Sequence, residues 1–168
     1  MYRGKRKDTG EWVYGWLVKD WMGGTHIITE FGPDVAHCLE CGAQVQKSFE
    51  VDPATVGQYL PVKLRDGKEV AYEGDVVRQL EWGYIARSEI HDLDEFLRTE
   101  KVVSYEEDGD FISYYYESGR DVVTLERFRF WLKNESFGWE GEDLWNPEYC
   151  EIIGNIYDHP HLLKGVSE

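Results

Sequence analysis

The most strongly patterned part of the sequence includes Arg65-Asp66-Gly67-Lys68-Glu69-Val70-Ala71-Tyr72-Glu73-Gly74-Asp75-Val76-Val77. It places two glycine turns around one short β-rich segment. Glycine adopts the positive φ angles of tight turns at little cost, and an Asp carboxylate accepts hydrogen bonds from nearby backbone N–H groups. The pattern predicts turn, strand, turn and strand, as in a small β-barrel. We therefore interpret Glu73, Gly74 and Asp75 as fold-forming residues and not as a carboxylate site.

Strand signals continue on both sides of this stretch. Residues 2–7 and 11–18 enclose Asp8-Thr9-Gly10, which predicts a hairpin. A short helix is expected after Asp52, because Pro53 fits a first helical turn that an Asp side chain caps. β-Branched and aromatic residues predict further strands at residues 25–31, 44–51, 102–105, 111–116, 121–125, 127–133 and 149–157.

One segment has helical periodicity. In residues 88–101, Ile90, Leu93, Phe96 and Leu97 recur on one side, with charged residues on the other. The predicted fold class is α+β, mainly β: small antiparallel sheets that include an SH3-like barrel element around residues 55–87, with one short amphipathic helix at about 88–101. We expect a single domain over residues 1–168. A division into lobes 1–54 and 55–168 stays open.

Composition excludes several classes of protein. The chain of 168 residues has 7 Trp, 11 Tyr and 7 Phe, too much aromatic surface for a disordered chain, and it has no apolar run of membrane-span length. Residues 1–7 are basic but precede no apolar segment, so we expect no secretory signal and a cytoplasmic protein. The net charge is −15. Residues 89–168 carry seven positive and twenty negative side chains, which disfavours direct binding of nucleic acid.

Cys38-Leu39-Glu40-Cys41-Gly42 is the clearest chemical motif, because a C-x-x-C turn presents two thiolates as half of a zinc site does. A structural zinc needs four ligands, and His37, His26 or Cys150 would have to complete the set. The alternatives are a reduced, metal-free pair and a redox pair. His159 and His161 are interpreted as solvated side chains. Motifs of nucleophile elbows, phosphate loops and dinucleotide sites are lacking.

The order of the motifs resembles the YopX family of phage and prophage proteins. The blocks that carry the resemblance are residues 2–15, Val51-Asp52-Pro53-Ala54-Thr55-Val56-Gly57-Gln58-Tyr59, residues 66–77 and residues 151–163. Residues 60–64 and 37–42 depart from the family pattern, so a zinc site is not implied by the resemblance. What it implies is a small, mostly β protein of no established activity, without catalytic residues or a cofactor to carry over.

Three hypotheses follow. The first is a non-enzymatic accessory protein of a phage or prophage in a bacterial cytoplasm, which binds a host or phage protein and forms a homo-oligomer, since Trp and Tyr suit interfaces. The second is an acidic DNA mimic that uses residues 89–168 to inhibit a nucleic-acid-binding host protein. The third is a hydrolase that uses a carboxylate with His26 or His91. No membrane and no nucleic acid are expected as direct partners.

Overall fold

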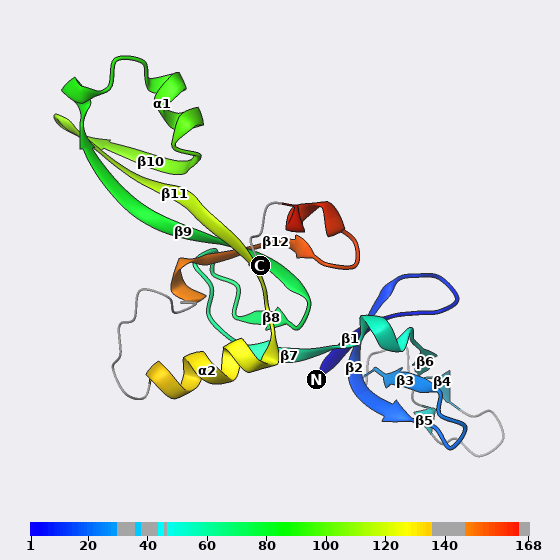
Figure 1. The fold of residues 1–168 in the computed structure, drawn as a ribbon. Coiled ribbons are helices and arrows are strands. Elements are labelled where there is room, and N and C mark those ends of the chain that lie inside the picture. The colour runs from blue at the N-terminus through cyan, green and yellow to red at the C-terminus, as the bar shows by residue number, and fades with distance from the viewer. Residues whose placement is uncertain (30–35, 38–43, 46, 136–146, 165–168) are drawn as a thin grey trace. The chain divides into compact units, whose positions relative to one another are not determined.

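The structure of the protein is a computed structural model (Figure 1). It describes residues 1–29, 36–37, 44–45, 47–135 and 147–164. The chain divides into two compact units, Met1–Pro61 and Val62–Glu168. Each unit is built mainly from antiparallel strands. Among the described residues, no helix is both long enough and apolar enough to cross a membrane.

The first unit is a sheet of short strands. Within it, β6, β3, β2, β1 and β7 lie side by side in this order, and the neighbouring strands run antiparallel. Ile27 and Val51 are fully buried, and Gly4 lies against both because it has no side chain. Asp52 caps a 3₁₀ turn as predicted, accepting a hydrogen bond from the Ala54 N–H at 3.0 Å. The elements of this unit are β1 (Tyr2–Lys5), β2 (Trp12–Lys19), β3 (Thr25–Ile28), β4 (Ala36–His37), β5 (Gln44–Val45), β6 (Ser48–Glu50), η1 (Pro53–Thr55) and β7 (Gly57–Pro61).

The second unit is organised around a four-stranded antiparallel sheet with the order β10-β11-β9-β12. Strands β9 and β11 are its longest, and β10, β11 and part of β9 extend away from β12 toward α1 (Figure 1). The elements of this unit are β8 (Val70–Tyr72), β9 (Asp75–Ala86), η2 (Arg87–Glu89), α1 (Leu93–Thr99), β10 (Val102–Asp108), β11 (Phe111–Val122), α2 (Leu125–Glu135), η3 (Pro147–Tyr149), β12 (Cys150–Asn155) and η4 (Pro160–Leu163).

The two glycine turns predicted at residues 65–77 are confirmed. Gly67 and Gly74 have φ values of +80° and +85°. The Asp75 side chain is 4% exposed and accepts a hydrogen bond from the Tyr72 N–H at 2.8 Å, which closes the turn from β8 into β9. The Gly74 carbonyl also accepts from the Ile156 N–H beyond β12. These residues therefore form the fold, as their sequence pattern indicated.

The helix predicted at residues 88–101 is shorter than its periodicity suggested. An α-helix covers only Leu93–Thr99, and residues 87–89 form a separate 3₁₀ turn. The reason is the cap: the Asp92 side chain accepts from the Glu95 N–H at 3.0 Å, which starts the helix at Leu93. Beyond the helix, Lys101 has a φ of +52°, which turns the chain into β10.

The prediction of a strand at residues 127–133 is wrong, because Leu125–Glu135 is the helix α2. Its start is fixed by Thr124, whose side-chain oxygen accepts from the Arg127 N–H at 3.3 Å. The alternation that suggested a strand also fits a helix, since Leu125, Phe128 and Leu132 recur at i, i+3 and i+7. The mainly β, α+β class is nevertheless confirmed, and one of the two larger sheets curls into a half-barrel.

Candidate functional site

The arm of the second unit consists of β10, β11, α1 and the outer half of β9, and the strand register defines its two faces. Side chains that lie directly opposite one another across a pair point to the same side of a sheet. Trp82 pairs with Tyr115, Tyr84 with Ser113 and Ala86 with Phe111, while the side chain of Ile85 points to the other side. One face thus carries the rings of Trp82, Tyr84 and Phe111, and the other faces α1.

Helix α1 covers one face of the arm. Phe96 of α1 meets Tyr114 edge to face, with ring centroids 5.1 Å apart. Tyr114 lies across Gly83, where even a Cβ atom would come within 2.4 Å of its ring. Ile112 on the same face is completely buried. The Glu81 carboxylate accepts a 2.5 Å hydrogen bond from the Tyr116 hydroxyl and raises the pKa of that phenol. On this side of the arm, the packing centres on Ile112 and Tyr114 beneath α1.

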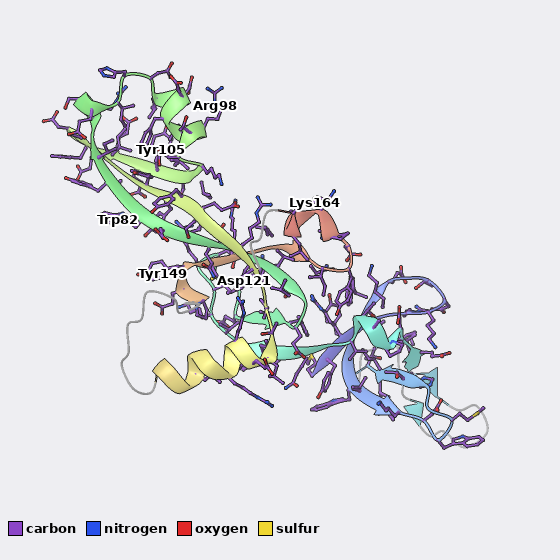
Figure 2. All side chains as sticks on the ribbon, viewed as in Figure 1. Trp82, Arg98, Tyr105, Asp121, Tyr149 and Lys164 are labelled. Carbon is purple, nitrogen blue, oxygen red and sulfur yellow. The ribbon has the colours of Figure 1, made fainter. Side chains whose placement is uncertain are left out.

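The opposite face exposes three large rings: Trp82 is 58% exposed, Tyr84 is 55% and Phe111 is 41%. We call these three side chains the aromatic face. Their rings form a continuous row, with centroid distances of 6.0 Å from Trp82 to Tyr84 and 4.8 Å from Tyr84 to Phe111. In Figure 2, Trp82 on β9 and Arg98 on α1 lie on opposite sides of the arm. Contiguous exposed rings of this kind mark binding surfaces more often than isolated ones do.

A cluster of guanidinium groups lies at the inner end of the aromatic face. Arg65 Nη1 donates to one oxygen of Glu151 at 2.6 Å, and Arg78 donates to the other at 3.0 and 2.7 Å. The Arg65 guanidinium also lies 4.1 Å above the ring of Tyr115, which is opposite Trp82. Two cations share one carboxylate, so this cluster, the basic end, has a net charge of +1.

Two carboxylates lie at the outer end of the same face. Glu106 is opposite Ser113 and Asp108 is opposite Phe111, so both point to the side of the aromatic face. Both residues are exposed, and no ion pair joins either of them to a cation within the described part of the chain. We call this pair the acidic end. The face therefore carries opposite charges at its two ends.

The first unit has an exposed apolar surface of its own. On one side of β2, Tyr14 is 47% exposed, Trp16 is 55% and Val18 is 40%, and in the following loop Trp21 is 92% exposed and Met22 is 76%. We call these five residues the β2 stripe. Tyr14, Trp16 and Val18 share one side of β2 because successive side chains of a strand point to opposite sides.

The loop that carries Trp21 and Met22 is held by Asp20. One oxygen of its side chain accepts from the N–H groups of Met22 and Gly24, at 2.8 and 2.7 Å. The other oxygen lies 3.0 Å from His26 Nε2. The hydrogen bond from the Gly24 backbone is the main reason why the pKa of Asp20 lies below its usual range. The loop is thus a built structure that presents two apolar side chains to solvent.

The histidines proposed for a hydrolase lie in different surroundings. His26 lies between Asp20 and Ser48, whose side-chain oxygen is 3.5 Å from His26 Nδ1. The Asp20 side chain is 38% exposed and already binds two backbone N–H groups, so this row of three side chains is open to water and braces the loop. His91 is exposed immediately before the cap of α1. Among the described residues, neither His26 nor His91 belongs to a cluster of three or more His, Cys, Asp or Glu side chains that could hold a metal.

The predicted zinc ligands Cys38 and Cys41 lie outside the described residues, and so does the side chain of His37, whose backbone is in β4. Zinc therefore stays one of the three alternatives for the C-x-x-C motif, beside a reduced, metal-free pair and a redox pair. Cys150 is 1% exposed, and burial raises the pKa of its thiol to about 12. Across the described residues, no three His, Cys, Asp or Glu side chains gather as a metal site would require. The Nδ1 atom of His159 accepts a hydrogen bond from the Asn155 N–H at 3.4 Å.

Sequence reasoning missed the residues of the aromatic face. The signal was present in Leu80, Trp82, Tyr84 and Ala86, whose alternation assigns all four to one side of a strand. What it did not show is that α1 would cover the other side of the sheet and leave this one open. The basic end was equally hidden, because Arg65, Arg78 and Glu151 come from three distant segments.

Comparison with known proteins gives one result. No curated protein and no solved structure matches the chain significantly. The profile of the family described as YopX protein matches residues 1–164, which is nearly the whole sequence. The resemblance seen in the ordered turn and strand motifs is thereby confirmed, and the chain belongs to the YopX family.

Proposed function

We propose that this protein is a non-enzymatic accessory protein encoded by a phage or prophage, which works in the cytoplasm of a bacterial host by binding another protein. The observation that supports this proposal is the aromatic face: three rings, each more than 40% exposed, in one row on the arm. Trp and Tyr are enriched among the residues that contribute most to protein–protein affinity. Family membership fits this role without specifying it.

The arrangement of the rings favours a protein over a sugar or a nucleobase. Tyr84 and Phe111 are nearly parallel, with an interplanar angle of 13° and a centroid distance of 4.8 Å. Rings this close cannot lie side by side in one plane, so their faces are turned toward each other. Sugars and bases stack on open ring faces. The exposed ring edges, flanked by charges of both signs, suit the mixed apolar and polar surface of a protein.

A comparative pull-down tests this function. The full chain serves as bait in lysates of infected or lysogenic bacteria, beside the double variant Trp82→Ala/Tyr84→Ala and the control Tyr105→Ala. Tyr105 is 42% exposed and lies on the same arm, but it is opposite Tyr114 and so belongs to the other face. We expect a protein that the wild type and the control retain and the double variant loses. Equal retention by all three baits would contradict the assignment of the aromatic face.

Self-association is the second part of the proposal, and the β2 stripe is the surface we assign to it. Its five exposed apolar side chains, with Trp21 at 92% exposure, form a large apolar surface. Light scattering after size exclusion should show an oligomer for the wild type and a smaller species for Trp16→Ala/Trp21→Ala. A strictly monomeric wild type at high concentration would refute the homo-oligomer.

The DNA-mimic alternative is favoured by one feature, the exposed acidic run of Glu106, Glu107 and Asp108 in β10. It predicts that a nucleic-acid-binding host protein is captured and then released by moderate salt, since exposed charge pairs are screened. Reversing the three charges should abolish that capture. Capture that persists after reversal, or at high salt, would exclude the mimic.

The hydrolase alternative rests on Asp20, His26 and Ser48. If Ser48 were a nucleophile activated by His26, a serine-directed fluorophosphonate would label it, and His26→Ala would prevent the labelling. Under the non-enzymatic proposal we expect no labelling of Ser48 in the wild type. Peptide mass mapping distinguishes the two results, and a His26-dependent adduct would contradict the proposal.

A further inference from the structure

The charges around the aromatic face restrict the kind of partner that fits it. The face has a net positive group at its inner end, where Arg65 and Arg78 share Glu151, and two negative groups at its outer end, Glu106 and Asp108. The nearest further cation on this face, Arg120, is opposite Arg78 and is already paired with Glu117 at 2.7 Å. The polarity of the face is therefore not cancelled by its neighbours.

The length of the face follows from the register. Arg78 and Ala86 are eight residues apart on β9, and Ala86 is opposite Phe111, which is opposite Asp108. At about 3.3 Å per residue, Arg78 therefore lies about 26 Å from the row of Phe111 and Asp108. The Arg65 guanidinium, which lies above Tyr115 and donates to Ser104, is only four residues, or about 13 Å, from that row. A partner segment that spans both ends is a strand of about eight residues or a helix of about 17 residues. The three rings lie beside these charges, because Trp82 is in the row of Arg65, Tyr84 in the row of Glu106 and Phe111 in the row of Asp108.

We propose that the aromatic face binds an extended or helical segment of another protein that is acidic toward one end, basic toward the other and apolar along the side that meets the rings. Its carboxylates lie against Arg65 and Arg78, its apolar side chains against the rings, and its Lys or Arg side chains against Glu106 and Asp108. This inference rests on the proposed function, because it names the partner of the same surface. Complementary charges at the rim fix the register and orientation of such a segment, while the rings supply most of the affinity.

The face also discriminates against uniformly charged ligands. A nucleic acid strand would meet favourable charge at the basic end and repulsion at the acidic end. A wholly basic peptide would meet the reverse. Only a segment with opposite charges at its ends gains at both, and this requirement makes the inference specific enough to test without knowing the natural partner.

The probe is a phage-displayed library of random peptides of about 20 residues, which is long enough to span the face as a helix. It is selected on the full chain and depleted on the double variant Trp82→Ala/Tyr84→Ala. We expect enriched peptides with Asp or Glu toward one end, Lys or Arg toward the other, and apolar residues recurring along one side. Uniformly charged winners would overturn the inference.

Charge reversal tests the orientation. For one enriched peptide made synthetically, Glu106→Lys/Asp108→Lys should weaken binding about tenfold, equivalent to about 1.4 kcal/mol. The matched control is Glu107→Lys on the same strand, which is opposite Ile112 and therefore points to the covered side, and it should leave the affinity unchanged. A peptide whose Lys and Arg are replaced by Glu should regain its affinity for the reversed variant.

The outcomes separate this inference from the proposed function. Peptides that need the rings but ignore the charge reversal overturn the inference and leave the binding function standing. If no ring-dependent peptide is enriched, both fail. Sedimentation equilibrium tests whether a second copy of this chain occupies the aromatic face. A wild-type dimer that Trp82→Ala/Tyr84→Ala abolishes would show that it does, and this result also overturns the inference.

Discussion

Replacing Ile112 and Tyr84 by alanine, one at a time, measures how differently the two faces of the arm contribute to stability. The side chain of Ile112 is fully buried on the side of the sheet that α1 covers, whereas Tyr84 is 55% exposed on the aromatic face. Truncating a fully buried isoleucine costs about 2–4 kcal/mol in lost transfer energy and cavity formation. Truncating Tyr84 loses about half of its burial and the contact with Phe111, for which we expect about 1 kcal/mol.

The assay is thermal and urea unfolding of the full chain, followed by near-UV circular dichroism. For a chain of this length, 1 kcal/mol shifts the midpoint by about 2–4 °C, so Ile112→Ala should lower it by roughly 5–15 °C and Tyr84→Ala by less than about 4 °C. If Ile112→Ala does not fold, Ile112→Val, with an expected cost of about 0.5–1.5 kcal/mol, replaces it. A loss for Tyr84→Ala as large as that for Ile112→Ala would refute the division of the arm into a core side and an open side.

Three further predictions concern single residues. Gly74→Ala should lower the free energy of unfolding by at least about 2 kcal/mol, because φ is +85° and the new Cβ would lie 2.9 Å from the Tyr157 ring. Gly109→Ala should lower it by only about 1 kcal/mol, because φ is +62° but no atom lies within 4 Å of the new Cβ. Parallel urea titrations compare the two variants. Cys150 should resist iodoacetamide at about pH 8 until the protein unfolds, since burial raises the pKa of its thiol to about 12. Peptide mapping follows the modification, and rapid alkylation of Cys150 in the native protein would contradict its burial. Folding lowers the pKa of Asp20, so its charge stabilises the protein above the ordinary Asp pKa of about 4, and this contribution is lost as the pH falls through the lowered value. Between about pH 6 and about pH 3, Asp20→Asn should therefore lose less stability than the wild type. Equal losses for the two proteins in urea titrations would count against the role of the charge.

The elements that sequence reasoning predicted well are those whose structure is set locally. The turns at Gly67 and Gly74, the cap at Asp52 and the strands at residues 102–105 and 111–116 depend on neighbouring residues, so their patterns were sufficient. The segment 127–133 was assigned wrongly because Phe128, Phe130 and Leu132 satisfy a strand period, while the Thr124 cap and the spacing of Leu125, Phe128 and Leu132 fit a helix.

The candidate surface could not be predicted from local pattern, because exposure depends on which face another element covers. The period of β9 places Trp82 and Tyr84 on one side, but only the position of Phe96 on Tyr114 shows that the other side is the covered one. The joint binding of Glu151 by Arg65 and Arg78 likewise depends on the order of strands in the sheet. Such contacts between distant segments leave no short motif in a single sequence.

Site-specific photo-crosslinking in the bacterial host tests most directly whether the aromatic face is where this protein meets its partner. The crosslinking amino acid p-benzoylphenylalanine replaces Tyr84 in one variant and Tyr105, on the covered side of the same arm, in the other. We predict that irradiation joins the Tyr84 variant to a second protein and leaves the Tyr105 variant unlinked. If the Tyr84 variant forms no adduct, or if both variants form adducts in equal yield, the aromatic face is not the surface that binds the partner.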